Sequence, residues 1–479
     1  MSNPGEADAT PIASARQLAE HIAAGCKPRE TWRIGTEHEK FGFRRPVRDG
    51  EPGASGSGAS GPGASGPGAS GSGVAYEPPG YAPDGIRAVL DGIAARGWTP
   101  ISDAGAVIGL SRGGASVSLE PAGQFELSGA PLATLHETRA ELDSHFEDVR
   151  AVAGPMGLGF APLGFRPTGV REAMPWMPKS RYAIMRRYMQ RTGTRGLDMM
   201  LRTCTVQVNL DYGSEADMVR KLRVGLLLQP VATALFANSP FTEGRPNGFL
   251  SARANVWLDT DADRTGIPAA VFEEGFGFER YVEWLLDVPM YFVMRQGAYV
   301  DLAGRSFRDF MAGRLGEVPG GEAPGVATVG DFADHMTTAF TEVRLKRFLE
   351  MRGADAGTPE MMLAQSALWV GLLYDDAALE AAVSLVGRHP WRDFAALREQ
   401  VPRQGLGAAW GKGTLRDVAR DVVAIARDGL RARGLGEEAL LAPLHAIVAG
   451  GPTQAEHWLG RYHGAWRGDV RRVFDEAEI

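Results

Sequence analysis

Four short segments of this chain place carboxylate, amide or guanidinium side chains at two-residue spacing, which puts them on one face of a β-strand. The segments are IGTEHEKFGF, SLEPAGQFELSGAP, CTVQVNLDY and RFLEMRGAD. Their polar side chains at this spacing are Glu37, Glu39, Glu120, Gln124, Glu126, Gln207, Asn209, Glu350 and Arg352. If the segments share one sheet, it has one apolar face and one face crowded with carboxylates. Crowded carboxylates repel unless cations neutralise them, so the pattern predicts bound Mg²⁺ and an anionic substrate.

A plainer interpretation exists for each segment taken alone. An antiparallel strand with one solvated face alternates polar and apolar residues in any case. Solvated faces are usually rich in Lys, Thr and mixed charges, whereas these four segments repeat Glu, Gln and Asn. Their recurrence in one chain favours a functional face over a solvated one.

Arginines add a second signal, because a guanidinium binds carboxylates and phosphates with two parallel hydrogen bonds. Most arginines simply lie at the surface with a covering aliphatic stem. Arg202, Arg253 and Arg352 stand in apolar or strand-like surroundings, where an unpaired guanidinium would be costly. Arg186 lies in SRYAIMRRYM, a segment rich in arginine.

Composition bounds the class of protein. The chain has 479 residues, of which 44% are hydrophobic and 23% charged, as in a soluble globular protein of one large domain or two to three ordinary ones. Its net charge is −7 and it lacks a Lys/Arg cluster, so it is a poor candidate for binding nucleic acid or an anionic membrane. The longest apolar stretch, 224–237, contains Gln229 and Pro230 and is too short to span a bilayer. We expect a buried helix there, broken or kinked near Pro230.

The two cysteines, Cys26 and Cys204, are too few for a disulfide framework or a closed zinc site. They fit a reducing compartment. The first residues have no basic and apolar signal pattern. These observations together predict a cytoplasmic protein.

Strand and helix patterns alternate without the regular spacing of a doubly wound sheet. We therefore predict an α+β fold with an antiparallel sheet and a helical C-terminal part. Strands are expected over 32–43, 106–128 as a hairpin turning at Gly113-Gly114, 156–165, within 196–212, and at 346–351. Helices are expected over 14–25, 85–97, 130–153, 180–190, 214–236, 275–289, 306–313, 414–434 and 455–477.

A low-complexity segment interrupts this pattern. GASGS, GASGP, GASGP and GASGS run in tandem from Gly53 to Ser72, and such a composition forms no core. We expect a flexible insert over 49–73 within a single domain over 14–479, because a candidate site strand precedes the insert. Residues 1–13 are expected to be disordered.

Common nucleotide-binding and hydrolase motifs do not match. GLGAAWGKGTL has the wrong spacing for a P-loop, and GLGFAPLG lacks the third glycine of a dinucleotide fingerprint. The chain has no G-x-S-x-G and no H-E-x-x-H. These common motifs are therefore rejected for this chain.

The strings WRIGTEHEKFGF, SLEPAGQFELSGAPL, GLDMMLRTCTVQVNLDY, LFANSPFTEGRPNGFLSAR, EVRLKRFLEMRGAD and WVGLLYDD resemble the glutamate–cysteine ligases of plants and proteobacteria. The resemblance runs from about Arg16 to the C-terminus, omitting the insert. It implies a glutamine-synthetase-like carboxylate–amine ligase fold with a six-stranded antiparallel sheet. It also implies the first step of glutathione synthesis: ATP phosphorylates the γ-carboxylate of L-glutamate, and the amino group of L-cysteine attacks the acyl phosphate.

The resemblance and the polar pattern together assign roles. Arg352 would neutralise the transferring phosphoryl group, while Arg253, Arg202 and Arg186 would bind the glutamate carboxylates or phosphate. Gln124 is expected to bind substrate. Gln207 and Asn209 would bind substrate or metal. The expected Mg²⁺ ligands are Glu37, Glu39, Glu120, Glu126 and Glu350. The protein is expected to be a monomer or a homodimer.

Two alternatives stay open at this stage. One is a related ligase that joins glutamate to a different amine, which an amine-acceptor screen distinguishes. The other is a non-catalytic scaffold, which would be expected to have lost some of the five glutamates, all of which are present.

The chain also departs from the family pattern. Plant members are regulated through disulfides, and here Cys26 stands in GCKP. The later segments VDLAGRSF, AGRLGEVP and MLAQSALW contain no cysteine. Because the partner thiols are missing, we predict no intramolecular redox switch.

Overall fold

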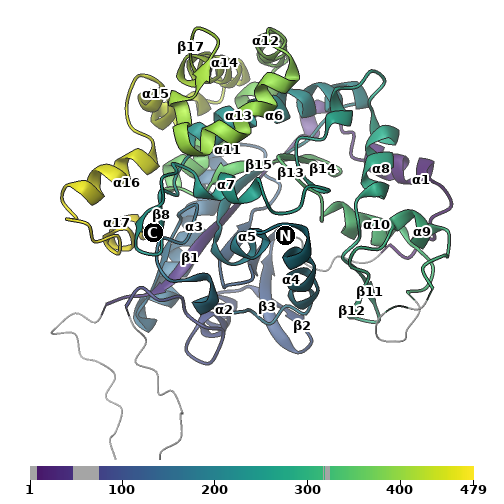
Figure 1. Ribbon diagram of the computed structural model, residues 1–479, viewed down its shortest axis with the longest axis horizontal. Helices are drawn as coiled ribbons and strands as arrows, with labels where there is room; N and C mark the ends of the chain where they lie inside the picture. Colours follow the sequence, from purple (N-terminus) through teal and green to yellow (C-terminus); the bar gives the residue numbers. More distant parts are fainter. Residues whose placement is uncertain (1–7, 47–74, 317, 319–323) are drawn as a thin grey trace, which may run out of the picture.

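An antiparallel sheet forms the centre of the computed structural model, which describes residues 8–46, 75–316, 318 and 324–479 (Figure 1). Within these residues the sheet has nine strands, in the order β14-β15-β7-β1-β5-β4-β3-β2, with β6 also paired to β1. The strands are β1 (Ile34–Arg44), β2 (Thr99–Asp103), β3 (Ala106–Arg112), β4 (Ala115–Leu119), β5 (Phe125–Ser128), β6 (Leu158–Ala161), β7 (Thr205–Leu210), β14 (Val343–Leu345) and β15 (Leu349–Asp355).

Strand β1 organises the sheet because it is long enough to pair with three partners. Its first half pairs with β7 and β5, and its second half with β6. The expected hairpin is present: β3 and β4 pair across Gly113 and Gly114, which have φ values of +57° and +89°. Glycine adopts these left-handed values without the steric cost of a Cβ.

Helices cover the sheet on both faces (Figure 1). The apolar face, which includes Val206, Val208 and Leu210, shares one core with α3 (Leu135–Ala153), α6 (Glu215–Leu235) and α11 (Pro359–Leu373). Over the polar face lie α4 (Arg181–Thr192), α5 (Gly196–Arg202) and α7 (Ala252–Trp257), whose side chains line a pocket. The further helices before α11 are α1 (Ala15–Ala23), α2 (Ile86–Ala94), α8 (Phe278–Asp287), α9 (Phe307–Met311) and α10 (Val329–Met336).

The C-terminal part is helical, as expected. It continues after α11 with α12 (Asp376–Val386), α13 (Trp391–Gln404), α14 (Leu415–Arg433), α15 (Ala442–Val448), α16 (Gln454–His463) and α17 (Arg472–Ala477). The helix expected over 455–477 is therefore two helices, because the chain leaves the helical conformation at Gly464 and turns again at Gly468, where φ is +86°. None of the described helices is long and apolar enough to cross a membrane.

Several sequence-based expectations need correction. The resemblance implied six strands in the sheet, and the described residues form nine. Pro230 lies inside α6 without ending it. Residues 8–13, expected to be disordered, pair with the start of α10: Ile12 donates to the carbonyl of Ala327, and Val329 to that of Thr10. The expected insert over 49–73 lies outside the described residues.

Candidate active site

Strand pairing brings the predicted polar residues into rows across the sheet. Glu37 of β1 lies opposite Gln207 of β7, and Asn209 of β7 lies opposite Glu350 of β15. On the other side of β1, Glu39 lies opposite Glu126 of β5. The two-residue spacing therefore places side chains from four strands on one face, as predicted.

One end of this face is a cluster of buried carboxylates. Burial, together with the charges of Glu120 and Glu126, raises the pKa of Glu39 well above its ordinary value. Burial and the charge of Glu126 also raise the pKa of Glu120. Oε2 of Glu39 accepts the main-chain N–H of Thr205 at 2.8 Å, and Oε1 of Glu120 has no hydrogen-bond partner among the described residues. This cluster therefore favours a bound cation or protons.

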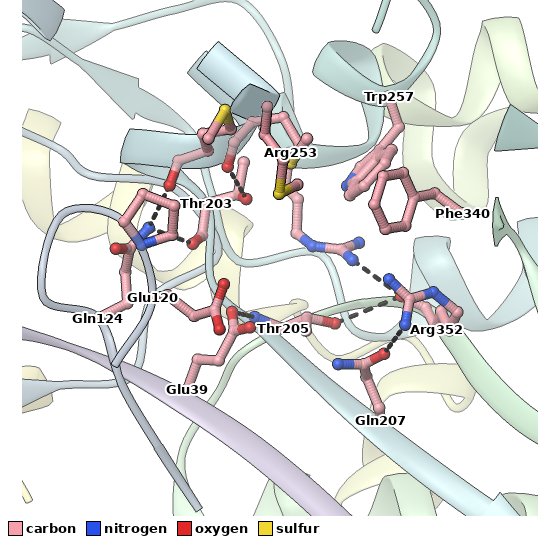
Figure 2. A pocket seen from close by; sticks show the side chains of 14 residues that line it. Glu39, Glu120, Gln124, Thr203, Thr205, Gln207, Arg253, Trp257, Phe340 and Arg352 are labelled. Carbon is pink, nitrogen blue, oxygen red and sulfur yellow. Dashed lines mark hydrogen bonds between the residues drawn. The ribbon is translucent and has the colours of Figure 1, made fainter. Parts of the chain in front are cut away.

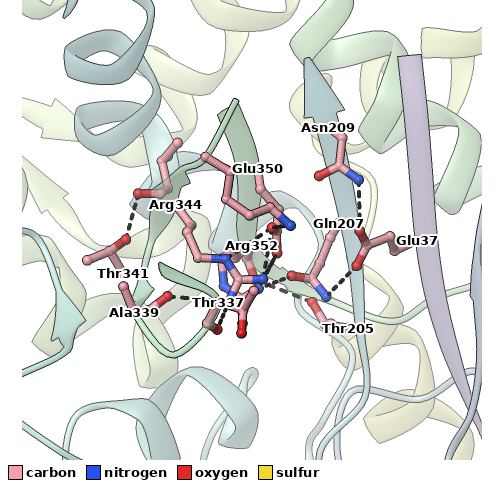
Figure 3. Close-up of polar contacts among 12 residues, drawn as sticks. Glu37, Thr205, Gln207, Asn209, Thr337, Ala339, Thr341, Arg344, Glu350 and Arg352 are labelled. Atoms are coloured by element: carbon pink, nitrogen blue, oxygen red, sulfur yellow. Dashed lines mark hydrogen bonds and ion pairs between the residues drawn. The ribbon is translucent and has the colours of Figure 1, made fainter. Parts of the chain in front are cut away.

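Glu37 lies at the middle of the face, held by two amides. Nδ2 of Asn209 donates to its Oε1 at 2.8 Å and Nε2 of Gln207 to its Oε2 at 3.4 Å (Figure 3). Burial and the charge of Glu350 raise the pKa of Glu37. The amides orient the carboxylate without neutralising it.

Glu350 differs, because three cations surround it. Arg344 of β14 contacts both of its oxygens, at 2.7 and 2.9 Å from Nη2, and Nζ of Lys346 lies 2.9 Å from Oε2 (Figure 3). Arg352 also pairs with Oε1. Burial alone would raise the pKa of Glu350, yet these cations hold it well below its usual range. A role for Glu350 as a metal ligand would require at least one of the cations to turn away.

A pocket opens over the face, with an empty volume of about 570 Å³ that includes space open to solvent (Figure 2). Glu39 and Glu120 lie toward one side of the pocket, and toward the other side lie Arg352, from β15 of the same sheet, and Arg253, from the covering helix α7. Its remaining wall is mostly apolar. The lining residues are Glu39, Glu120, Pro121, Gln124, Met185, Met199, Met200, Thr203, Thr205, Gln207, Arg253, Trp257, Phe340 and Arg352.

The side chain of one pocket arginine, Arg253, contacts the main chain of the other, Arg352. Nη2 of Arg253 donates to the carbonyl oxygen of Arg352 at 2.8 Å. Arg352 donates from Nη1 to Oε1 of Gln207. The β15–β7 register shifts between Met351 and Ala354, so Arg352 lies at a strand irregularity. Irregularities of this kind re-aim side chains next to active sites.

Two of the predicted arginines lie elsewhere. Arg202 is the last residue of α5 and pairs with Asp198 at 2.7 Å and Glu243 at 3.0 Å, outside the set that lines the pocket. Arg186 is exposed on α4, with its guanidinium 4.7 Å from the ring centroid of Trp176. The structure therefore does not bring either residue to the candidate site.

Gln124 does line the pocket, but its side-chain amide is already hydrogen-bonded to main-chain groups. Nε2 donates to the carbonyls of Met200 and Thr203, and Oε1 accepts the N–H of Ala122. The side chain of Gln124 therefore joins this part of the pocket wall to the end of α5. Substrate binding by Gln124 stays a prediction, and it would require the substrate to replace these main-chain partners.

Two cations beside the carboxylate cluster were missing from the predicted site. Nζ of Lys179 donates to Oγ of Ser118 at 3.2 Å, and Ser118 in turn donates to Glu126 at 3.0 Å. Burial lowers the pKa of Lys179 to about 8; Arg181 acts in the same direction, while Glu120 and Glu126 oppose it. Arg181 is buried beside them. The sequence signal was the pair of basic residues two apart in MPKSRY, just before α4.

The donor set can be tested against Mg²⁺. As the side chains lie, no three His, Cys, Asp or Glu residues of the described chain form a group that would hold a metal ion. Mg²⁺, however, commonly takes one or two carboxylates and completes its shell with water and substrate phosphates. Glu39 and Glu120, with raised pKa values and one oxygen unpaired among the described residues, fit such a site.

The described residues thus form an antiparallel sheet whose acidic face lies beneath a partly open pocket. A solved glutamate–cysteine ligase of Francisella tularensis, in complex with AMP, shares the fold with a TM-score of 0.52 at 10% identity, covering 93% of this chain and 88% of that chain. The predicted α+β fold, with an antiparallel sheet and a helical C-terminal part, is thus confirmed as a fold shared with that ligase.

Sequence comparison is more specific. The model of glutamate-cysteine ligase family 2 matches residues 72–476. The chain is 50% identical to the chloroplastic glutamate–cysteine ligase of Arabidopsis thaliana, over 98% of this chain and 83% of the relative. It is 48% identical to that of Medicago truncatula, over 98% of this chain and 86% of the relative. The chain therefore belongs to glutamate-cysteine ligase family 2.

The relatives also correct one expectation. The sequence predicted a cytoplasmic protein, whereas these similar plant enzymes are named chloroplastic. The prediction of a cytoplasmic location is therefore wrong. It rested on cysteine count and the first residues, neither of which distinguishes a plastid from the cytoplasm.

Proposed function

We propose that this protein is an ATP-dependent ligase that joins the γ-carboxylate of L-glutamate to the amino group of L-cysteine and forms γ-glutamylcysteine, the first step of glutathione biosynthesis. Family membership over nearly the whole chain supports the reaction. The AMP complex of the Francisella tularensis enzyme supports use of an adenine nucleotide. Residues 14–479 would act as one catalytic unit.

The observation that best supports this proposal is the distribution of charge in the pocket. Glu39 and Glu120 lie on one side, and Arg253 and Arg352 lie on the other (Figure 2). ATP and glutamate bring several negative charges together. Phosphoryl transfer depends mainly on positioning these groups and neutralising their charge. Two buried guanidiniums beside buried carboxylates provide both.

We assign the chemistry in two steps. An oxygen of the glutamate γ-carboxylate attacks the γ-phosphorus of ATP, giving an acyl phosphate and ADP. The neutral amino group of cysteine then attacks the acyl carbon, the bond from that carbon to the phosphate oxygen breaks, and the departing phosphate takes up the proton that the nitrogen loses. Arg352 and Arg253 would contact the transferring phosphoryl group and a substrate carboxylate. No protein nucleophile is required.

Magnesium is part of this proposal. Glu39 and Glu120 are the favoured ligands, with Glu37 and Glu126 next to them on the same face. When bound, Mg²⁺ would neutralise phosphate oxygens during transfer. Glu350 would instead hold Arg344 and Arg352 in place.

The apolar part of the pocket suits the second substrate. Met185, Met199 and Met200 line it together with Trp257 and Phe340. Methionine sulfur and aromatic rings are polarizable and adapt to small apolar groups. The apolar wall would therefore accommodate the thiol side chain of L-cysteine beside the acyl phosphate, while the amino group of L-cysteine faces the polar wall.

The deciding experiment measures phosphate release from Mg·ATP with L-glutamate, with and without L-cysteine, followed by mass analysis of the product. Cysteine-dependent release with γ-glutamylcysteine as product is the expected result. Turnover with only a different amine would retain the ligase mechanism and reject the substrate. Absence of ATP turnover with every acceptor tested would reject the function.

A further inference from the structure

Asp355, the last residue of β15, is a fully buried carboxylate that accepts three hydrogen bonds from outside the sheet. The main-chain N–H of Asn238 and Oγ of Ser239 donate to Oδ2, at 2.8 and 2.6 Å. Oγ of Ser251 donates to Oδ1 at 2.8 Å. One side chain thus ties β15 to the segment after α6 and to the start of α7.

The same two serines fix the first turn of α7. Ser251 caps the helix, because its Oγ accepts the N–H of Ala254 at 3.1 Å. Oγ of Ser239 accepts the N–H of Arg253 at 3.2 Å. Each hydroxyl accepts from an N–H and so directs its own proton to Asp355. Three converging donors match a carboxylate that only accepts hydrogen bonds, and they counteract the burial that raises the pKa of Asp355.

The side chain of Arg253 also makes a hydrogen bond to β15, the strand that carries Asp355. Its Nη2 donates to the carbonyl of Arg352, three residues before Asp355 on β15. The main chain of Arg253 is therefore linked to β15 through Ser239, and its side chain is hydrogen-bonded to β15 directly. Space for the carboxylate depends on Gly164, since a Cβ there would lie 2.4 Å from Cγ of Asp355.

We propose that Asp355 is a positioning residue for the ligase reaction. Through Ser239 and Ser251 it sets α7 so that the guanidinium of Arg253 meets Arg352 in the pocket. The inference rests on the proposed function and deepens it, because it names what aligns the two arginines. Asp355 is not among the residues that line the pocket, and it acts through Arg253.

A double-mutant cycle tests this action. The variants are Asp355→Asn, Arg253→Lys and the double variant, with kcat and KM measured for L-glutamate at saturating Mg·ATP and L-cysteine. Displacing a positioned group by up to 1 Å costs about 10- to 100-fold in rate, so Asp355→Asn is expected to lower kcat/KM by about 10-fold or more. In the Arg253→Lys background the same change is expected to cost less than about 3-fold, because coupled residues are not additive.

Asp148 of α3 offers a matched control. It is also a buried acid with three side-chain donors: Nε of Arg96 at 2.6 Å, Nε1 of Trp98 at 3.2 Å and Nη2 of Arg112 at 3.4 Å. Asp148→Asn is expected to lower the urea midpoint while leaving kcat/KM unchanged. If Asp355 had a purely structural role, Asp355→Asn would likewise lower the urea midpoint and leave kcat/KM unchanged.

Each outcome decides the proposal. Full additivity of Asp355→Asn and Arg253→Lys, or wild-type kcat/KM in Asp355→Asn, would overturn it. If Asp355→Asn does not fold, Ser251→Ala removes one of the hydrogen bonds to Asp355 and is tested in the same cycle. The product made by the wild type decides the proposed function separately, since that assay does not involve Asp355.

Discussion

Nδ2 of Asn209 lies 2.8 Å from Oε1 of Glu37, so an amide of β7 orients a carboxylate of β1 at the centre of the polar face. A lysine there would have neutralised Glu37, whereas an amide leaves its charge available. The pKa of Glu37 is already raised by burial and by Glu350. Such a carboxylate gains most from a cation that arrives with the nucleotide.

The carboxylate cluster predicts a metal-dependent defect. Glu39→Gln is expected to lower kcat/KM by about 100-fold and to raise the Mg²⁺ concentration needed for half-maximal turnover, because a ligand charge is lost. Initial rates over a Mg²⁺ series at fixed ATP provide the measurement.

Glu141→Gln is the matched control for this variant. Glu141 lies on α3 and accepts the N–H of Ala130 at 2.8 Å, outside the pocket lining. Its turnover and Mg²⁺ dependence are expected to equal those of the wild type. A Glu39→Gln enzyme with an unchanged Mg²⁺ requirement would remove Glu39 from the metal site.

The arginines predict two separate kinds of damage. Arg352→Lys keeps the charge but loses the planar guanidinium, whose Nη1 contacts both Gln207 and Glu350 and whose other N–H groups remain for a substrate oxygen. We therefore expect kcat/KM to fall by about 100-fold with little change in stability. Arg202→Ala leaves Asp198 without its buried partner. It is expected to cost about 2 kcal/mol of unfolding free energy and less than about 3-fold in kcat/KM.

Urea unfolding and steady-state kinetics on both variants check this contrast. The reverse pattern, with Arg202→Ala inactive but stable, would restore Arg202 to the site.

The contrast between these arginines also shows how far sequence reasoning reached. Two-residue spacing placed Glu37, Glu39 and Gln207 correctly, because strand geometry fixes which face a side chain occupies. Arg202 and Arg186 lie on helices, where an apolar context does not say which way a side chain points. Only tertiary packing decides that direction.

Lys179 and Arg181 escaped prediction for a related reason. They stand before and at the start of α4, and reach Glu120 and Glu126 only once that helix lies over β4 and β5. Local pattern carries no information about such a contact between distant segments. The nine-stranded order of the sheet was beyond prediction on the same ground, since pairing of β7 between β1 and β15 joins residues far apart in the chain.

The raised carboxylate pKa values predict that Glu39 and Glu120 contribute a fall in stability with rising pH in metal-free protein. Glu39 and Glu120 hold protons more tightly when folded than unfolded, where the ordinary value is 4.5. Between 4.5 and the raised folded pKa the folded state binds more protons, so unfolding free energy falls as pH rises through this window. Glu350 acts oppositely and only below 4.5, where its stabilisation is lost as pH falls.

Urea midpoints without metal, measured in steps from pH 5 to 8, test this expectation. Glu39→Gln should flatten the decline, and saturating Mg²⁺ with nucleotide should reduce it. Buried His38 and His145, whose pKa values are held well below 6.5 mainly by burial, contribute a slope of the opposite sign, so the comparison of Glu39→Gln with the wild type decides the assignment. A Glu39→Gln profile with the same slope as that of the wild type would contradict it.

The described residues on either side of the predicted insert, Arg44 and Tyr76, lie next to each other, which predicts that the insert can be removed. The N–H of Tyr76 donates to the carbonyl of Arg44 at 2.7 Å, and Arg166 donates to the carbonyls of Gly42 and Tyr76 at 2.7 and 2.6 Å. Deleting residues 49–73 is therefore expected to leave kcat and KM unchanged and to raise unfolding free energy by at most about 1–2 kcal/mol, through a shorter loop closure. Loss of turnover in a stably folded deletion would assign the insert a catalytic role.

The cysteines predict insensitivity to reductant. Cys204 is fully buried, and burial together with Glu39 raises the pKa of its thiol well above the usual value. Burial and the charges of Glu215 and Asp217 also raise the pKa of Cys26, and both thiols are free. Because the thiolate is the reactive form, neither is expected to exchange readily. Turnover after incubation with dithiothreitol or with oxidised glutathione should agree within about 2-fold, the spread expected for a protein whose thiolate fraction is small at neutral pH. Activity that falls with reductant and returns on oxidation would show a disulfide between these cysteines or between two chains. Cys204→Ser would separate the two, because it removes the disulfide within one chain and leaves Cys26 able to pair with a second chain.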